Sequence, residues 1–269
     1  MCGIVGAVAE RNVVPILMEG LRRLEYRGYD SAGIAVRVEE GIARVRRVGK
    51  VQELAKALEE TPVRGGTGIS HTRWATHGVP NESNAHPHLS SEKIAIVHNG
   101  IIENYEELRD DLKEKGYTFT SDTDTEIVAH RIHYNTQHAD DFAGAVRMTV
   151  TELEGAYALA VMSVDHPGQI VIARAGAPAV VGIGIDENFV ASDVAALLPV
   201  TRNFMFLDEG DVALVERKKV TVWNEKGEIA ERDVRESTLN ADSAERGEFR
   251  HFMLKEIYEQ PDAVARTLD

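Results

Sequence analysis

The chain contains a single cysteine, and that cysteine stands at position 2. Initiator methionine is commonly removed when a small residue follows it, and its removal would give Cys2 a free α-amino group. Such an amine titrates at about pH 7.7–8.0, so part of it is unprotonated at neutral pH and can accept the thiol proton of its own residue. Nucleophile and base would then belong to one amino acid, which allows acyl transfer through a thioester without a separate histidine. A retained Met1 would turn this amine into an amide and abolish the chemistry.

A lone cysteine is more often an inert, buried small hydrophobe, so a catalytic Cys2 needs partners. A thioester mechanism requires hydrogen-bond donors for the oxyanion of its tetrahedral intermediate. Asn99-Gly100 could supply them at the end of a strand, from a side-chain amide and from the backbone N–H of a glycine. An ordinary Asn-Gly turn is the simpler interpretation of that dipeptide alone. Lipidation is another alternative for Cys2, but no membrane-directing feature lies nearby.

Two charged residues could hold a zwitterionic substrate beside the thiol. Arg73 offers a planar fork for a carboxylate, and Asp124 could receive an ammonium group. A surface ion pair is the plain alternative for Arg73, and an interaction with a helix dipole is the plain alternative for Asp124. If both face one pocket near Cys2, they would bind an α-amino acid whose side chain carries the scissile amide.

Five histidines lie close together in the sequence and raise the question of a metal site. Their spacing matches no common ligand pattern, and HExxH is absent. His77 and His86 are instead expected to order the surrounding loop or to contact substrate. Neither GxxxxGK[ST] nor GxGxxG occurs, so no nucleotide, metal or other cofactor is expected. The five histidines are His71, His77, His86, His88 and His98.

The composition disfavours several classes of protein. With 269 residues, 43% hydrophobic and 28% charged, the chain is long enough for one large or two small globular domains. A formal charge of −14 without a dense Lys/Arg cluster argues against binding to nucleic acid. No run reaches the roughly 18 apolar residues of a membrane span, and Glu10 and Arg11 interrupt any signal-peptide core. The single cysteine fits a reducing compartment, so we expect a cytoplasmic protein with no membrane partner.

The elements that must position the candidate residues alternate between β-rich and helical segments. Residues 3–9 predict a buried strand, Asn12 is expected to cap the helix that follows, and a capping box from Thr123 to Glu126 predicts another helix. The segment from Arg73 onward is a loop of about twenty residues, a length that is usually functional. Two β-rich portions with helices between them predict stacked sheets with helices outside. Further strands are predicted at 32–38, 42–48, 67–72, 94–98, 156–164, 169–174, 179–185, 188–191, 204–207, 211–215 and 218–223, and further helices at 51–60, 101–116 and 141–153.

The C-terminal part of the chain differs in composition from the rest. Residues 231–250 are polar and nearly free of apolar periodicity, which predicts a linker. An amphipathic pattern then begins at residue 251 and stops at residue 269, as expected of a chain cut before a second domain. We therefore expect one domain over residues 2–240, and a linker with the start of a second domain over residues 241–269.

Six motifs occur in order along the first half of the chain. They are CGIVG at 2–6, YRGYDSAG at 26–33, HTRWATHG at 71–78, NAHPH at 84–88, HNGIIEN at 98–104 and SDTDTE at 121–126. On these motifs the chain resembles the class II glutamine amidotransferases, and specifically the glutaminase domain of glutamine:fructose-6-phosphate amidotransferases. Amidophosphoribosyltransferases share the N-terminal cysteine, RGxDSxG and the Asn-Gly pair, but YRGYDSAG with HTRWATHG favours the sugar enzymes. The resemblance implies an α+β fold, the αββα four-layer sandwich of N-terminal-nucleophile hydrolases.

The resemblance also implies a role for each matching residue. Cys2 would attack the side-chain amide of glutamine while its own α-amine carries the proton, and Asn99 and Gly100 would form the oxyanion hole. Arg73 would bind the α-carboxylate of glutamine, and Asp124 would bind its α-amino group. The other implied residues are Thr76, His77 and Gly100 as further lining of the glutamine pocket, Trp74 in a loop that closes over the substrate, and Arg27 and His86 as supports of the site.

The activity implied by the resemblance is hydrolysis of L-glutamine to glutamate and ammonia. In complete enzymes of that family the ammonia passes through a channel to a C-terminal sugar-isomerase domain, which makes glucosamine 6-phosphate from fructose 6-phosphate. Dimerisation in the family depends largely on that domain, so a homodimer is expected of the full-length enzyme, whereas the present chain is compatible with a monomer. Three alternatives stay open: a glutaminase domain serving another acceptor, such as phosphoribosyl pyrophosphate; an inactive relative that only binds an amino acid or a partner; and a histidine-rich metal module.

Overall fold

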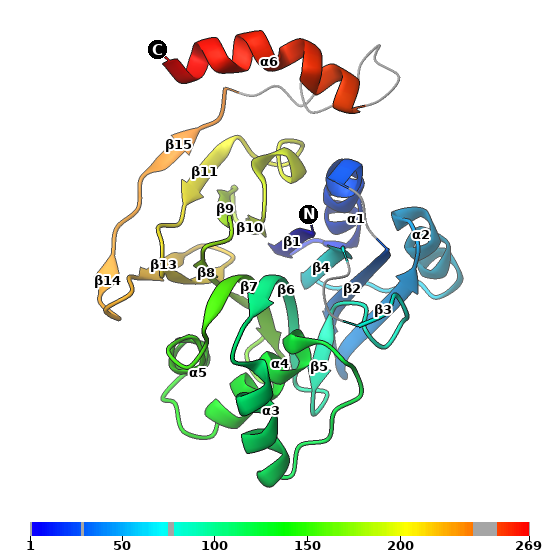
Figure 1. Cartoon of the computed structure of the whole chain (residues 1–269), viewed down its shortest axis with the longest axis vertical. Coiled ribbons are helices and arrows are strands. Elements are labelled where there is room, and N and C mark those ends of the chain that lie inside the picture. The colour runs from blue at the N-terminus through cyan, green and yellow to red at the C-terminus, as the bar shows by residue number, and fades with distance from the viewer. Residues whose placement is uncertain (1, 28–29, 75–77, 239–251, 269) are drawn as a thin grey trace. The chain divides into compact units, whose positions relative to one another are not determined.

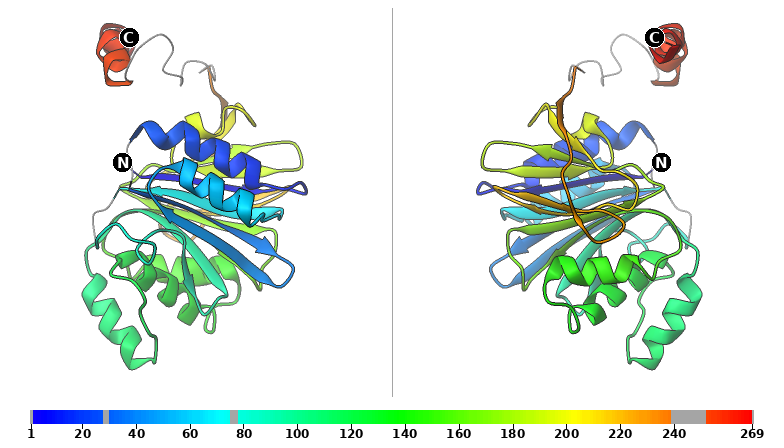
Figure 2. Two further views of the ribbon diagram at one scale, coloured as in Figure 1. Left: turned by 90° about the vertical axis from the view of Figure 1, so that its right-hand side faces the viewer. Right: turned by 90° about the vertical axis from the view of Figure 1, so that its left-hand side faces the viewer.

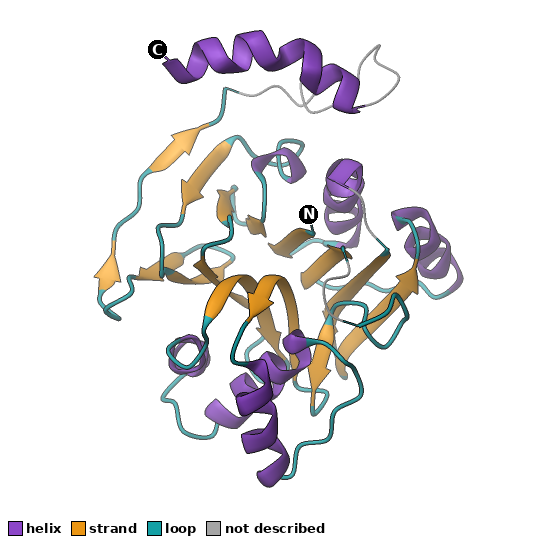
Figure 3. Cartoon of the chain, in the orientation of Figure 1, coloured by secondary structure: helices purple, strands orange, loops and turns teal. Residues whose placement is uncertain are grey.

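The computed structural model describes residues 2–27, 30–74, 78–238 and 252–268. The chain divides into two compact units, Met1–Ser237 and Thr238–Asp269. The described residues of the first unit form two sheets and five α-helices, and the described element of the second unit is the helix α6 (Phe252–Leu268) (Figure 3). Within the described residues, no helix has the length and apolar character needed to cross a membrane.

The first sheet has eight antiparallel strands in the order β15-β11-β9-β10-β1-β4-β2-β3 (Figure 1). The strand that follows Cys2, β1, lies in its interior, between β10 and β4. In this register Gly3 pairs with Thr72, so the N-terminal end of β1 lies beside the end of β4 that carries Arg73. The strands are β1 (Gly3–Val8), β2 (Ser31–Val38), β3 (Gly41–Val48), β4 (Thr67–Arg73), β9 (Val180–Ile183), β10 (Asn188–Ala191), β11 (Asn203–Phe206) and β15 (Val234–Glu236).

The second sheet has seven antiparallel strands in the order β14-β13-β12-β8-β7-β6-β5. Its longest strands, β6 and β7, are paired along their whole length, from Ile94 opposite Ser163 to Ile102 opposite Gly155. The strands are β5 (His88–Ser90), β6 (Ile94–Ile102), β7 (Gly155–Ser163), β8 (Gln169–Ala175), β12 (Val212–Glu216), β13 (Val220–Trp223) and β14 (Ile229–Ala230).

Helices cover the outer face of each sheet, which gives four layers (Figure 2). One outer layer contains α1 (Val14–Leu24) and α2 (Val51–Glu60), and the other contains α3 (Tyr105–Glu114), α4 (Asp124–Asn135) and α5 (Phe142–Val150). Two short 3-10 helices, η1 (Glu25–Arg27) and η2 (Val194–Ala196), complete the unit. The predicted αββα sandwich is therefore confirmed.

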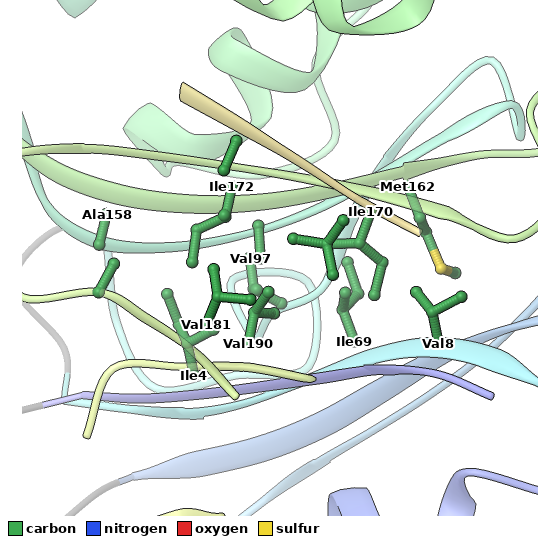
Figure 4. Close-up of a cluster of buried hydrophobic side chains, with 14 of the residues drawn as sticks. Ile4, Val8, Ile69, Val97, Ala158, Met162, Ile170, Ile172, Val181 and Val190 are labelled. Atoms are coloured by element: carbon green, nitrogen blue, oxygen red, sulfur yellow. The ribbon is translucent and has the colours of Figure 1, made fainter. Parts of the chain in front are cut away.

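The alternation of side chains along β1 explains why this strand is fully buried. Ile4 and Val8 point into the hydrophobic cluster between the two sheets, where Ile69, Ile172 and Val190 meet them (Figure 4). Val5 has the opposite orientation and packs against the helix α1, where a Cβ at Gly20 would lie 2.9 Å from its methyl groups. A second cluster joins the other sheet to its helices through Ile96, Leu112, Ile127, Ile132, Phe142 and Leu159. Packing on both faces fixes the position of Cys2, which directly precedes β1.

The strand β6 is longer than predicted. It continues through Asn99, Gly100 and Ile101 to Ile102, and the helix α3 begins only at Tyr105. Ile101 is exposed while Ile102 is fully buried, which is the two-residue period of a strand. Asn99 pairs with Ala158 and Gly100 with Tyr157, so the interpretation of this dipeptide as a turn is wrong.

Three other local expectations need correction. Val13, not Asn12, occupies the N-cap of α1, and the Asn12 side chain accepts from the backbone N–H of Gly65 and of Val14. The capping box is half formed: Thr123 accepts from the N–H of Glu126, but the Glu126 carboxylate binds Thr120 and Ser121. Part of the predicted linker, Val234–Glu236, forms β15 because its backbone pairs with the edge of β11. The extent of a second domain stays a prediction.

Candidate active site

A cavity of about 480 Å³ lies where the first residues of β1 approach the end of β4 and the strand β6. Strands of both sheets therefore contribute to one site. Seven of the predicted site residues line this cavity: Cys2, Arg73, Trp74, His86, Asn99, Gly100 and Asp124. Thr76 and His77 lie outside the described residues, and so does the side chain of Arg27 in η1.

The thiol of Cys2 is held against the backbone of Trp74. The N–H of Trp74 donates to Sγ of Cys2 at 3.0 Å, and the Trp74 carbonyl oxygen lies 3.6 Å from the same sulfur. Burial raises the pKa of the Cys2 thiol, although the Trp74 N–H and the charge of Arg73 oppose this. The thiol is therefore neutral at neutral pH, so nucleophilic attack requires a base.

The side chain of Asn99 reaches across from the second sheet to the residue that carries the thiol. Its Nδ2 donates to the carbonyl oxygen of Cys2 at 3.3 Å, and its Oδ1 lies 3.0 Å from Nε2 of His71. Next to it, Gly100 has a φ of +125°, a backbone conformation that side chains of L-residues rarely adopt. An amide donor and a glycine backbone thus lie together on the wall beside Cys2.

Two opposite charges are buried in the walls of the same cavity. The side chain of Arg73 is 5% exposed, so its contact with Asp30, at 3.6 Å from Nη1, is not a surface ion pair. Its Nη2 donates to the carbonyl oxygen of Gly78. Asp124 is the first residue of α4, where a carboxylate interacts favourably with the helix dipole, and its Oδ2 accepts from the N–H of Ile102 at 2.9 Å. A zwitterion placed between them would find a partner for each charge.

Four of the five histidines lie together: His71, His86 and His98 line the cavity, and His88 is buried beside His86. His71 and His86 stack with ring centroids 4.1 Å apart, and Nε2 of His88 contacts the hydroxyl of Thr123 at 3.0 Å. Burial lowers the pKa of His71 to about 3 and lowers the pKa of His86 and of His88 well below the usual value. Among the described residues no group of three or more metal-ligating side chains occurs. Hydroxyl, amide and backbone groups are the partners of these imidazoles.

Several residues of the site escaped prediction. Thr125 and His98 line the cavity and contact each other at 2.9 Å, and Ser192 lines it from the segment after β10. The hydroxyl of Ser192 accepts from the N–H of Ile4 at 3.0 Å, which ties the start of β1 in place. Thr125 belongs to the SDTDTE motif and could have been found there, but nothing in the sequence around Ser192 indicates proximity to Cys2.

The arrangement suits one kind of chemistry. A zwitterionic amino acid held by Arg73 and Asp124 could extend its side chain toward Cys2, and Asn99 offers an N–H donor at that end of the cavity. Attack by the thiol on a side-chain amide, with the oxyanion stabilised beside Asn99 and Gly100, is the reaction this geometry favours.

The sequence matches a family and many curated proteins. The family model described as "Glutamine amidotransferase domain" matches residues 71–199. Glutamine--fructose-6-phosphate aminotransferase (isomerizing) of Shewanella oneidensis is 59% identical over 269 residues, and the protein of that name from Escherichia coli K12 is 55% identical over 269 residues. The comparison covers 100% of this chain but 44% of each relative, so the chain spans less than half the length of the curated relatives that it matches.

Solved structures share the fold. Glutamine phosphoribosylpyrophosphate amidotransferase from B. subtilis superposes with a TM-score of 0.73 at 24% identity, over 85% of this chain and 50% of that one. A glutamine aminotransferase class-II domain protein from Silicibacter pomeroyi superposes with a TM-score of 0.56 at 16% identity, over 83% of this chain and 99% of that one. The sequence match to the aminotransferases covers the whole chain, whereas the structural superpositions cover 85% and 83% of it. The chain therefore belongs to the glutamine amidotransferase family, as a glutaminase domain of the glutamine--fructose-6-phosphate aminotransferase type.

Proposed function

We propose that this chain hydrolyses L-glutamine to glutamate and ammonia, with Cys2 as the nucleophile. The observation that carries the proposal is the single cavity in which the Cys2 thiol, the Asn99 amide, the Arg73 guanidinium and the Asp124 carboxylate meet. Arg73 binds the α-carboxylate of glutamine through its planar fork, and Asp124 binds the α-ammonium group. These two contacts leave the side-chain amide of glutamine as the group that reaches the thiol.

The reaction proceeds through a thioester. After removal of Met1, the α-amine of Cys2 accepts the thiol proton, and the sulfur attacks the side-chain carbonyl carbon of glutamine. The negative charge on the carbonyl oxygen is stabilised by Nδ2 of Asn99 and the N–H of Gly100. The proton held by the amine passes to the departing nitrogen, ammonia leaves, and a thioester remains. Water then adds to the thioester carbon and gives one proton to the amine. When this tetrahedral adduct collapses, that proton passes to sulfur and glutamate is released.

The remaining predicted residues complete the pocket. Thr76 and His77 line it, and Trp74 belongs to the segment that covers bound glutamine. Trp74 is 53% exposed, so closure over glutamine would bury more of it. His86 lines the cavity and orders it, and Arg27 supports the surroundings of Cys2. These assignments follow from the resemblance, and mutation of each residue would test them.

The chain supplies ammonia to a further domain in our proposal. The relatives are named as isomerizing aminotransferases that act on fructose 6-phosphate, and the chain covers 44% of their length. A C-terminal sugar-isomerase domain is therefore proposed as its partner, glucosamine 6-phosphate as the product, a homodimer as the full-length assembly and the cytoplasm as its location. The alternative acceptor is phosphoribosyl pyrophosphate, which the name of the B. subtilis neighbour contains. The full-length protein given glutamine and either acceptor would distinguish the two.

Release of glutamate from L-glutamine tests the proposed hydrolysis. A preparation whose intact mass shows that Met1 has been removed should release glutamate and ammonia in equal amounts. A matched preparation that retains Met1 should release neither, because the base is then an amide. Equal activity of the two preparations would refute the amine as the base. No release from the processed protein would favour a domain that only binds an amino acid.

Arg73→Lys should weaken binding of glutamine. Lysine keeps the charge but loses the bidentate fork, so KM should rise by a factor of about 10–100, which corresponds to a charged hydrogen bond worth roughly 1.5–3 kcal/mol. Arg22→Lys, on the exposed face of α1, is the matched control and should leave KM unchanged. L-Glutaminamide lacks the carboxylate, so the parent should strongly prefer glutamine over it and Arg73→Lys should not. An undiminished preference in Arg73→Lys would contradict the assignment.

A further inference from the structure

The two ends of the Asn99 amide make different contacts that are not interchangeable. One end lies 3.3 Å from the carbonyl oxygen of Cys2, and a backbone carbonyl can only accept a hydrogen bond. The end that faces Cys2 must therefore be the NH2 group, and this fixes Oδ1 of Asn99 on the opposite side. There Oδ1 lies 3.0 Å from Nε2 of His71.

This contact assigns the proton on His71. An amide oxygen only accepts, so the hydrogen bond forms only if Nε2 of His71 carries the proton. Burial lowers the pKa of His71 to about 3, so its imidazole is neutral near pH 7 and has a single N–H to donate. The other nitrogen, Nδ1, is buried and has no hydrogen-bond partner among the described residues. The backbone of His98 also interacts with this imidazole, but the carbonyl of Cys2 fixes Oδ1 of Asn99 toward Nε2, and that contact is a hydrogen bond only with the proton on Nε2.

The imidazole of His71 is also held in a fixed orientation. His71 is 1% exposed, and its ring stacks on His86 with an interplanar angle of 18°. His86 is itself fixed at both nitrogens: Nδ1 accepts from the N–H of His98 at 3.3 Å, and Nε2 contacts the hydroxyl of Thr125 at 3.3 Å. His71 is thus a rigid donor aimed at one atom.

We propose that His71 is a positioning residue for the oxyanion hole, because its Nε2–H holds Asn99 with Nδ2 directed to the oxyanion beside Cys2. The proposal rests on the proposed glutaminase function. Without this donor the amide of Asn99 is held only by the 3.3 Å hydrogen bond to the Cys2 carbonyl, so it turns over more readily and its oxygen would then face the developing negative charge. Loss of one oxyanion donor lowers kcat by a factor of about 10²–10³. Arg73 and Asp124 keep their own contacts, so KM for glutamine should not change.

Two substitutions at one position test this proposal. His71→Leu removes the donor, and we expect kcat to fall by a factor of about 10² with KM unchanged. His71→Gln can place an amide N–H near the position of the imidazole Nε2, and we expect it to retain most of the parental kcat. Parental kcat in His71→Leu, or equal losses in both variants, would overturn the proposal.

Alkylation of Cys2 by iodoacetamide separates positioning from structural damage. The sulfur forms a C–S bond and iodide leaves, so no oxyanion develops and Asn99 is not needed. The alkylation rate should be the same in the parent, His71→Leu and His71→Gln. A fall in the alkylation rate that parallels the fall in kcat would show that the substitution damages the thiol site itself, and would overturn the proposal.

The tautomer of His71 can be measured in the parent without substrate. Long-range ¹H–¹⁵N spectra of the imidazole should show the Nε2–H form unchanged from about pH 5 to pH 8. An Nδ1–H tautomer, or protonation within that range, would overturn the proposal even if both variants failed to fold. A parent that does not hydrolyse glutamine would refute the proposed function instead, and this spectrum would still decide whether His71 holds Asn99.

Discussion

Cys2→Ala should abolish release of glutamate from L-glutamine by the protein that has lost Met1. Removal of a catalytic nucleophile typically lowers kcat by a factor on the order of 10⁴ or more, because the other groups of the site can then assist only direct attack by water. The thiol lies in the cavity that holds Arg73, Asn99 and Asp124, and it is the single thiol of the chain. No other side chain can replace it in thioester formation.

Binding of glutamine to Cys2→Ala should survive. Arg73 and Asp124 make the proposed contacts with the substrate charges. The hydrogen bonds of the Cys2 sulfur are with the backbone of Trp74 and not with either of these residues. Isothermal titration of Cys2→Ala with L-glutamine should therefore give a dissociation constant similar to the KM of the parent, provided that chemistry is slow compared with substrate release. Substantial glutamate release by Cys2→Ala would place the nucleophile elsewhere. Loss of both binding and turnover would show that the thiol is needed to form the pocket.

The layers of this fold could be predicted because the strands have strong local signals. Val-, Ile- and Ala-rich runs such as residues 156–164 lie in sheets that are buried on both faces, and the observed strand β7, Gly155–Ser163, differs by one residue at each end. The partners of each strand have no such signal. Pairing of β1 with β10 joins residues 180 or more positions apart, and β15 is a strand only because the edge of β11 is available to its polar backbone.

The site was predicted less completely than the fold, because tertiary contacts alone bring its remaining residues together. Motif residues such as Cys2, Arg73 and Asp124 were found because their types suggest a reaction. Thr125 and Ser192 act through contacts with distant backbone and side-chain groups, which a sequence does not display. The Asn-Gly pair was open to two interpretations because turn propensity is local, whereas pairing of nine residues of β6 with β7 overrides it.

Gly100→Ala should strongly destabilise the first unit as well as impair catalysis. With a φ of +125°, residue 100 has a backbone conformation that costs an alanine about 1–3 kcal/mol. A Cβ there would also overlap the carbonyl oxygen of Ala156 and lie 2.8 Å from its carbonyl carbon, and these are backbone atoms of the neighbouring strand that cannot rotate away. Separation of β6 from β7 to relieve this overlap adds a further cost of about 1–3 kcal/mol.

Gly41→Ala is the matched control for the stability of Gly100→Ala. Gly41 has a similar φ of +139°, but a Cβ at Gly41 would have no atom within 4 Å. Gly41→Ala therefore reports the backbone strain alone, and Gly100→Ala reports strain plus overlap. Thermal unfolding should show a fall in Tm for Gly100→Ala at least twice that for Gly41→Ala, on a scale of about 2–4 °C per kcal/mol for a unit of this size. Equal falls in Tm for the two variants would mean that β7 moves to accommodate the new methyl group. The close approach of β6 and β7 would then not explain why residue 100 is glycine.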